Sequence, residues 1–426
     1  MKVIRILSLC ILFLICTRET HAQKALKITV EEIEKQFLEK NLQLLAARYP
    51  IDMADAAIVQ AKVLNNPTIG VGDVNFWYPN AANELAVNPN AFGNRIVFSA
   101  QLEQMIRTAG KRRKLADVEN VSKEIAVQEF ESFLLGLKTE LRKTLHEIIY
   151  LQSYLNVIHL QQETVQKLVE VYKKQTTAGN IAKSEVLRLQ SSLIELETEA
   201  NELLIELHGL YKSLKILLNA PPETDIFVED TLPAAKNPHE IILNQLFDMA
   251  KNTHPVFLLS DLNMKYHENR LRYEKSQRSP DVGVSLNYDR YGGVWKNFFG
   301  MGVSIDIPLF NRNQGNIKIA KLSIEQSSYN ADYQKSVILQ DIAEAYEHYT
   351  LNYNYYQKLM RDDFSDDLES MMEGYTGNFL NKNINMLEYI DFMYAYKTTK
   401  QAILIAKKNV DTSFAELQFC VNNGIN

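Results

Sequence analysis

The chain has 426 residues, a formal net charge of −6 and three cysteines. This length allows two or three ordinary domains, and the acidic balance disfavours nucleic acid as a partner. Two of the cysteines, Cys10 and Cys16, lie in the first 22 residues. If that segment is removed, only Cys420 stays, no internal disulfide can form, and stability must come from packing or assembly.

Residues 1–22 have the pattern of a secretory signal peptide. Lys2 and Arg5 form a basic start, and a mostly apolar run of about ten residues follows. Thr20 and Ala22 then supply small residues at the −3 and −1 positions of a cleavage site. Removing the segment takes away a net charge of +2, which leaves a mature chain near −8. We therefore expect the protein to be exported.

Two features bear on how an exported chain of this kind meets a membrane. A lipid anchor at Cys16 is an alternative to simple cleavage, but the bulky Ile15 precedes it where a small residue is favoured. No later apolar run reaches 18 residues, so we expect no transmembrane helix. The chain is then either soluble or a β-barrel membrane protein.

In the first half of the chain the hydrophobic spacing predicts a helix, two strands and two further helices. The first helical segment, 29–65, contains Pro50, which should kink or split it. In the last of these helices, 182–218, apolar residues recur at alternating steps of three and four, which forms a heptad seam. This spacing favours coiled-coil packing against the preceding helix. The predicted ranges are 68–78 and 95–103 for the strands, 111–177 for a helix of about 100 Å, and 182–218 for the seam helix.

The second half repeats this order after a proline-containing connector, 223–238. Helical spacing covers 240–277 and includes Pro255. Two strands and two helices follow, at 281–289, 300–310, about 316–377 and about 384–422. The chain therefore consists of a first repeat, 23–222, and a second repeat, 239–426.

Matching residues support the duplication. We align Pro50 with Pro255, Pro67 with Pro280, Gly110 with Gly315 and Asn180 with Asn383, at offsets of 205, 213, 205 and 203. The offset falls from 213 to 205 across the paired strands. We therefore expect about eight extra residues in the first hairpin, most of them in its loop, where insertion is best tolerated.

The strands of the second repeat alternate with period two, so each has one apolar face and one small, polar face. Aromatic residues at the strand ends fit the interface girdles of an outer-membrane barrel, and edge clusters of a soluble sheet are the alternative. Four strands cannot close a barrel, so the barrel must be shared between chains. The residues expected to face lipid are Val282, Val284, Leu286, Tyr288, Val303, Ile305 and Ile307.

Three motifs carry a resemblance to a known family. They are Gly110-Lys111-Arg112 after the second strand, the run Ile307-Pro-Leu-Phe-Asn-Arg-Asn-Gln-Gly315 after the fourth, and the turn Gly179 to Arg188. With the duplication, these motifs resemble the TolC-like outer-membrane efflux proteins over essentially the whole mature chain. The first two are most similar to the branch that serves heavy-metal efflux pumps of the resistance-nodulation-division (RND) type.

The resemblance implies a fold and a set of partners. The fold class is mainly α with a β-barrel portion: a homotrimer forms one 12-stranded outer-membrane barrel, continued by an α-helical coiled-coil periplasmic tunnel. The expected partners are a periplasmic adaptor (membrane fusion protein), an inner-membrane RND transporter and outer-membrane lipid. Nucleic acid is not expected.

The resemblance also implies site residues at the two helix breaks. The adaptor-contact tips are Gly179, Asn180, Ile181, Lys382, Asn383 and Ile384, although ordinary helix caps and turns are the alternative. Lys382 departs from the family pattern, which has a glycine there. The tunnel aperture is formed by Glu388 and Asp391, with Glu185 and Arg188 at the other tip, and a solvated charged face is the alternative.

No catalytic or metal-binding constellation is visible in the sequence. There is no Cys-x-x-Cys and no HxxxH pair on a helix, His146 and His159 suit a helix surface or seam edge, and Met371-Met372 suits packing. We expect no enzyme activity, no cofactor and no resident metal.

The predicted function is therefore the outer-membrane channel of a tripartite efflux pump. It would be a passive exit duct for heavy-metal cations, located in the outer membrane and extending into the periplasm. A channel for drugs or for type I protein secretion is one alternative. A soluble periplasmic coiled-coil adaptor or scaffold is an alternative of another class.

Overall fold

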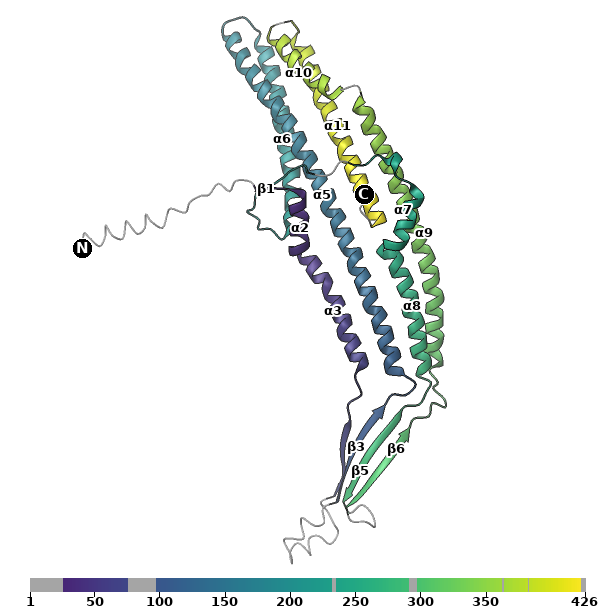
Figure 1. Ribbon diagram of the computed structural model, residues 1–426. Coiled ribbons are helices and arrows are strands. Elements are labelled where there is room, and N and C mark those ends of the chain that lie inside the picture. Colours follow the sequence, from purple (N-terminus) through teal and green to yellow (C-terminus); the bar gives the residue numbers. More distant parts are fainter. Residues whose placement is uncertain are drawn as a thin grey trace, which may run out of the picture. The chain divides into compact units, whose positions relative to one another are not determined.

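The computed structural model describes residues 26–75, 97–231, 235–290, 297–361, 364–381 and 383–422 (Figure 1). The expected signal peptide, the loop of the first hairpin and Lys382 lie outside these ranges. Contacts divide the chain into two units that each draw on both halves of the sequence. Unit 1 comprises Met1–Ala46, Leu134–Asp248 and Asp341–Asn426, and unit 2 comprises Ala47–Phe133 and Met249–Gln340.

Unit 1 is a bundle of long helices with a small strand pair. It contains α2 (Val30–Lys40), α6 (Lys183–Leu218), α10 (Phe364–Leu380), α11 (Met386–Val421) and the C-terminal part of α5 (Lys111–Thr177). β1 (Leu26–Ile28) pairs in parallel with β4 (Ile226–Val228), which is followed by the short 3-10 helix η2 (Pro238–Glu240) and by α7 (Leu243–Thr253). The strand pair joins the start of the chain to the connector between the repeats.

The core of unit 1 follows the heptad seam of α6. Leu189, Leu196, Leu207 and Leu214 are buried there, and they pack with a matching row on α5 that includes Leu141. Apolar residues that recur every three to four positions place one continuous stripe on each helix, which is the pattern of knobs-into-holes packing. The same core extends to α10 and α11, so the two helix pairs share one hydrophobic interior.

Unit 2 combines helices with a four-stranded antiparallel sheet. The helices are most of α3 (Leu42–Lys62), α8 (Pro255–Ser276) and parts of α5 and α9 (Gln314–Leu359). The strands are β2 (Thr68–Asn75), β3 (Val97–Ile106), β5 (Val282–Arg290) and β6 (Phe298–Ile305). Their order is β2-β3-β5-β6, so β5 lies between β3 and β6 and the two hairpins join through the β3–β5 ladder (Figure 1).

The last third of the chain differs from the sequence prediction. One helix was expected over 316–377, but α9 ends at Leu359 and α10 begins at Phe364. The sequence Asp362-Asp363 lies between them and outside the described residues. Two adjacent carboxylates without a helix-breaking residue give no clear signal for a helix end, so the hydrophobic spacing predicted a single helix.

Helix capping, and not proline, sets the breaks in the earlier helices. Pro50 lies inside α3 and does not split it, whereas the break falls at Asn41, between α2 and α3. The Asn41 side chain accepts the Leu44 N–H at 2.8 Å. Pro255 instead occupies the first position of α8, where its missing N–H is not needed. The alignment of Pro50 with Pro255 was therefore wrong.

Candidate channel surfaces

The sheet of unit 2 exposes one continuous apolar face. The β5–β6 register sets Val282 opposite Ile305 and Val284 opposite Val303. Val303 is 69 % exposed, much more than an apolar residue in a core strand would be. Leu286 and Tyr288 lie on β5, where Leu286 is exposed and Tyr288 is half-buried. Ile307 is exposed but lies after β6, which ends at Ile305 and not at 310 as predicted. An apolar patch of this kind needs a partner or a lipid surface to cover it.

The opposite face is lined by small and polar residues. A Cβ added at Gly283 would lie 2.3 Å from Ser304 Oγ and 2.9 Å from Glu103 Oε1, so the polar side chains of β3 and β6 converge over that glycine. A Cβ at Gly302 would likewise lie 2.6 Å from Ser285 Oγ. Large side chains are thus excluded from this part of the face, as the sequence alternation predicted.

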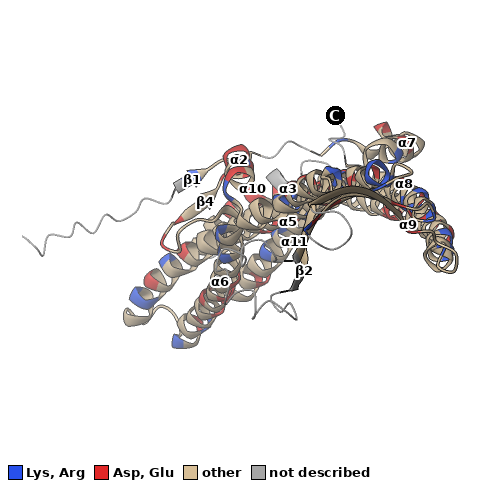
Figure 2. Ribbon diagram, turned by 90° about the horizontal axis from the view of Figure 1, so that it is seen from below, with Lys and Arg blue, Asp and Glu red and all other residues tan. Residues whose placement is uncertain are grey.

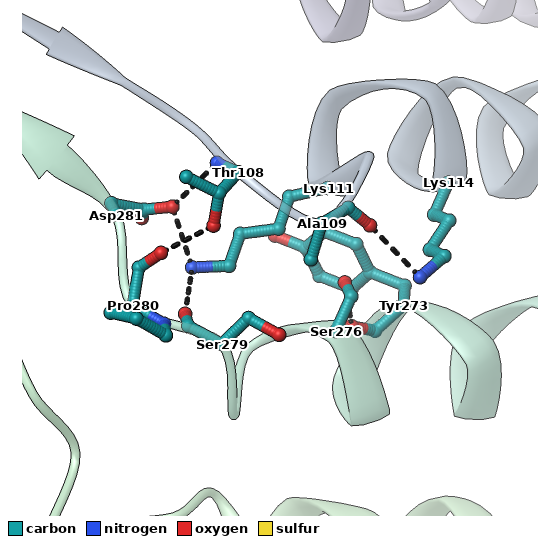
Figure 3. Close-up of polar contacts among 9 residues, drawn as sticks. All are labelled: Thr108, Ala109, Lys111, Lys114, Tyr273, Ser276, Ser279, Pro280 and Asp281. Carbon is teal, nitrogen blue, oxygen red and sulfur yellow. Dashed lines mark hydrogen bonds and ion pairs between the residues drawn. The ribbon is translucent and has the colours of Figure 1, made fainter.

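A buried ion pair joins the two repeats where the strands meet the helices (Figure 3). Lys111, the first residue of α5, is 4 % exposed, and its Nζ lies 2.7 Å from Asp281 Oδ1 and 2.8 Å from the Ser279 carbonyl oxygen. The same carboxylate accepts the Thr108 N–H at 2.9 Å, while the Thr108 hydroxyl donates to the Pro280 carbonyl. This cluster fixes the β3–α5 turn against the α8–β5 turn.

The sequence reasoning singled out Gly110-Lys111-Arg112 only as a family motif and did not find this role. Gly110 has φ +66°, a left-handed conformation that glycine adopts without strain. That turn brings Lys111 back toward the second repeat (Figure 3). A lysine directly after a positive-φ glycine at a helix start is an unusual signal, because basic residues are disfavoured at helix N-termini. The ion pair with the partly buried Asp281 carboxylate offsets this cost.

The two helix-hairpin ends in unit 1 terminate in the same way. The Asn180 N–H donates to the Gln175 carbonyl at 2.9 Å, and the Asn383 N–H donates to the Asn378 carbonyl at 2.8 Å. Both are six-to-one bonds of a Schellman-type helix end. Gly179 has the positive φ, +78°, that such an end requires. The equivalent residue of the second repeat, Lys382, lies outside the described residues.

The second hairpin end has a helix cap that the first lacks. The Asn385 Oδ1 accepts the N–H groups of Leu387 and Glu388 at 2.9 and 3.0 Å, and the Asn385 N–H donates to Glu388 Oε2 at 3.2 Å. This is a capping box. The N-cap of α6 is Ala182, which makes no side-chain bond. The sequence Asn-x-x-Glu carries this signal, but the prediction did not use it.

The capping box gives one predicted aperture residue a structural role. Glu388 is exposed, yet one of its carboxylate oxygens is held by its own helix start. Asp391 and Arg188 are also exposed, and Glu185 is half-buried. The structure thus places the acidic residues of α11 on an accessible surface near one hairpin end. Their role as an aperture stays a prediction.

An aromatic stack joins the two hairpin ends. Tyr172 of α5 stacks on Phe379 of α10 with ring centroids 5.2 Å apart, and Phe379 stacks on Tyr389 of α11 at 4.4 Å. Burial and the nearby Glu185 carboxylate raise the pKa of Tyr172 to about 12. The stack therefore connects the end of α5 with the end of α10 and the start of α11, and no sequence pattern indicated it.

Charged residues of α11 fasten it to the other helices of unit 1. Lys397 Nζ lies 2.5 Å from Glu199 Oε2 on α6, and the Tyr154 hydroxyl of α5 donates to the same carboxylate. Lys408 pairs with Glu147 of α5 at 3.0 Å. Figure 2 shows both signs of charge distributed along the helices. Such partly buried pairs favour one packing of α11 over alternatives.

A cavity of about 510 Å³ in unit 1 contains two groups with opposite pKa shifts. His146 is buried, and burial with the nearby Arg142 lowers its pKa to about 4. Asp411 lines the same cavity, and burial raises its pKa to about 6 against the opposing effect of Lys407. Both groups therefore favour their neutral forms, His146 throughout the neutral range and Asp411 below about pH 6.

Within the described residues, no group of three or more His, Cys, Asp and Glu side chains is placed to hold a metal ion. None of the helices described here is long and apolar enough to cross a membrane.

Comparison with known proteins gives the class to which this architecture corresponds. No protein-family model matches the chain. The cobalt-zinc-cadmium resistance protein CzcC of Cupriavidus metallidurans is 22 % identical over 296 residues, which cover 68 % of this chain. The match spans 65 % of the length of that relative.

Solved structures are similar over nearly the whole chain. CusC superposes with a TM-score of 0.72 at 14 % identity and covers 95 % of this chain and 96 % of its own. The Campylobacter jejuni outer membrane channel CmeC gives 0.72 at 12 %, covering 92 % and 85 %, and the Vibrio cholerae outer membrane protein VceC gives 0.69 at 13 %, covering 93 % and 96 %.

The fold predicted for the single chain, mainly α with strands from two hairpins, is confirmed. The chain has the fold of these outer-membrane channels, with long helices and a four-stranded sheet contributed by two hairpins. The resemblance to TolC-like outer-membrane efflux proteins, which the sequence motifs indicated, is confirmed by the same comparisons.

Proposed function

We propose that this protein is the outer-membrane channel of a tripartite efflux pump and that it conducts heavy-metal cations out of the cell. The observation that carries the proposal is the sheet of unit 2. It has an exposed apolar face and a small, polar face, and it occurs in a chain with the fold of outer-membrane channels. A sheet with these two faces suits a wall between lipid and water.

The protein would act as a passive duct. In this proposal three copies contribute four strands each to one barrel, which outer-membrane lipid surrounds, and the helices continue the conduit into the periplasm. An inner-membrane RND transporter supplies the energy and selects the cargo, and a periplasmic adaptor connects it to the hairpin ends around Gly179 and Asn383. No bond is made or broken in the duct, so no catalytic group is required.

Charge at the hairpin ends supports a cationic cargo. Asp391 and Glu388 are exposed at the start of α11, and threefold repetition would gather their carboxylates around one opening. A ring of carboxylates lowers the free energy of a cation in a narrow passage and raises that of an anion. The similarity to CzcC, named for cobalt, zinc and cadmium resistance, also supports a metal cargo for this chain.

Two experiments test the proposal. The first is fractionation: the protein should be recovered with the outer membrane and require detergent for release, whereas recovery in the soluble periplasm would favour a scaffold. The second is growth of a deletion strain on graded cobalt, zinc, cadmium, copper and silver. Sensitivity to at least one metal, restored by the parent gene, is expected. Sensitivity to drugs alone would replace the metal cargo by a drug cargo.

A further inference from the structure

The cavity of about 510 Å³ that contains His146 and Asp411 is lined by four separate segments of unit 1. They are the start of α2, the middle of α5, Thr231 after β4, and the last third of α11. The volume lies in the range of ~300–1,000 Å³ that small-molecule sites occupy. The cavity is thus large enough for a small molecule, and the chemistry of its lining decides which kind.

His146 is the buried polar group of this lining. Its side chain is 8 % exposed, and neither ring nitrogen forms a hydrogen bond with another residue in the described part of the chain. A neutral imidazole has one N–H donor and one lone pair that can accept. Buried polar groups in native proteins almost always have a hydrogen-bond partner. His146 therefore presents an unused donor and an unused acceptor to an occupant of the cavity.

The guanidinium group of the lining is already neutralised. Arg142 Nε lies 3.1 Å from Glu34 Oε1, and Arg142 Nη1 donates to Gln418 Oε1 at 2.7 Å. An anionic ligand would have to displace Glu34 from this pair, and it would meet the other carboxylates of the lining. The cavity is therefore poorly suited to an anion.

Two carboxylates of the lining have no such partner. Neither Glu31 of α2 nor Asp411 of α11 forms an ion pair or a hydrogen bond with a described residue. Lys407, one turn before Asp411 on α11, is instead bonded to Asp230 at 2.8 Å. The unbalanced charge of the lining is thus negative. A cavity lined by one sign of charge concentrates ligands of the opposite sign, so a cation is the favoured occupant.

The lining suits an organic cation better than a metal ion. No three His, Cys, Asp or Glu side chains among the described residues are placed to hold a metal, whereas protein metal sites commonly use three or four such ligands. Phe414 and Ala415 add apolar surface that can cover a carbon chain. We propose that this cavity binds a small aliphatic amine in its ammonium form, with Asp411 as its counter-ion and the His146 lone pair accepting one of its N–H groups.

A second ammonium group on the ligand would find a second carboxylate. Glu31 and Asp411 approach the cavity from different helices, so a diamine can pair with both, whereas a monoamine leaves one of them unpaired. The site is also distinct from the carboxylates at the hairpin end. Asp411 lies 20 residues after Asp391 in α11, which is ~30 Å along the helix.

Thermal unfolding of the detergent-purified protein at pH 7.5 tests the site. The probe is 1,4-diaminobutane, and 1,4-butanediol is its uncharged control of the same length. A ligand that binds only the folded state raises the melting temperature as its concentration rises. We expect a saturable rise with the diamine and none with the diol. Equal effects of both compounds, no effect of the diamine, or a rise with zinc chloride in place of the diamine would overturn the proposal.

Two substitutions locate the binding. Asp411→Asn keeps the shape of the side chain and removes its charge, so the Kd of the diamine measured by titration calorimetry should rise about tenfold or more. Asp367→Asn removes the same charge at an exposed position of α10 and should leave the Kd unchanged. An equal rise in both variants, or a rise in Asp391→Asn and not in Asp411→Asn, would place the amine elsewhere and overturn this site.

His146 gives a second test that leaves the charge of the cavity unaltered. His146→Leu removes the hydrogen-bond acceptor and should weaken diamine binding about fivefold. His146→Gln keeps one donor group and one acceptor, so it should recover most of the affinity. Equal affinity in His146→Leu and the parent protein would overturn the assigned role of His146.

The pH dependence of binding separates Asp411 from the charged and titratable groups around it. These are Glu31 and Glu34 of α2, Arg142 and His146 of α5, Asp230 after β4, and Lys407 of α11. Burial raises the pKa of Asp411 to about 6, so protons compete with the amine below that pH, whereas burial lowers the pKa of His146 to about 4 and keeps it neutral at pH 5. We expect the affinity to fall about tenfold from pH 7.5 to 5 in the parent and much less in Asp411→Asn. The same fall in both proteins would overturn Asp411 as the counter-ion.

Discussion

Substitution of Lys111 by Met tests the buried junction most sharply. The change keeps most of the apolar stem of the side chain and removes the ammonium group. Asp281 would then keep one N–H donor, that of Thr108, and the Ser279 carbonyl would lose the lysine. The carboxylate side chain is 26 % exposed, so water can solvate part of it.

The magnitude follows from these contacts. Removing one partner of a buried ion pair by substitution typically lowers the free energy of unfolding by about 3–5 kcal/mol. The partial exposure of Asp281 places the expected cost at the lower end, near ~3 kcal/mol. Replacing both residues, Lys111→Met with Asp281→Asn, removes the unpaired charge while an amide oxygen can still accept the Thr108 N–H. We therefore expect the double variant to lose less than Lys111→Met alone.

Hydrogen exchange at the Thr108 amide measures this directly, because that N–H donates to Asp281. We expect exchange at this amide to be about 100-fold faster in Lys111→Met, which corresponds to roughly 3 kcal/mol of lost protection. Lys114→Met is the matched control, since Lys114 is only half-buried and contacts only the Ala109 carbonyl among the pairs drawn in Figure 3. A change below threefold in Lys111→Met, or an equal change in the control, would show that the Lys111–Asp281 pair does not hold this junction.

Three further outcomes are expected. Asn385→Ala should destabilise the start of α11 by about 1 kcal/mol, seen as faster exchange of its first-turn amides. In His146→Gln, thermal stability should rise as pH falls from about 6 to 4, because protonation of Asp411 then favours the folded state. In Asp411→Asn, thermal stability should fall as pH falls from 6.5 to 4, because buried His146 resists protonation in the folded state. Equal slopes of thermal stability against pH in the two variants would contradict this. Glu388→Gln, which can keep the capping box, should weaken divalent-cation block of the pore about as much as Asp391→Asn, and an unchanged block would return both carboxylates to a solvated surface.

The strands and coiled-coil helices could be inferred from sequence because periodicity expresses burial directly. The alternation from Val282 to Tyr288 reports the two faces of β5, and the leucine seam of α6 reports one buried stripe. These signals are local, and neither is interrupted along its element. The turn at Gly179 could also be inferred locally, because that helix end requires a positive φ and glycine adopts it without strain.

What the sequence did not show depends on contacts between distant segments. Lys111 and Asp281 are 170 residues apart, and nothing near either residue reports that they meet. The aromatic stack at Tyr172 and Phe379 is likewise assembled from separate helices. The alignment of Gly110 with Gly315 failed because it matched a residue type, whereas backbone conformation places Asn313 at that position. Asparagine also adopts positive φ, which hides the equivalence from a residue-by-residue match.

Electrical recording from the purified protein in a planar lipid bilayer can show whether the protein is a cation-conducting channel. We expect stepwise conductance increments of uniform size, a higher permeability for cations than for anions, and block by divalent cations added to the side of the hairpin ends. Protein that inserts into the bilayer but gives no conductance, or a conductance that prefers anions, would contradict a cation-conducting outer-membrane channel.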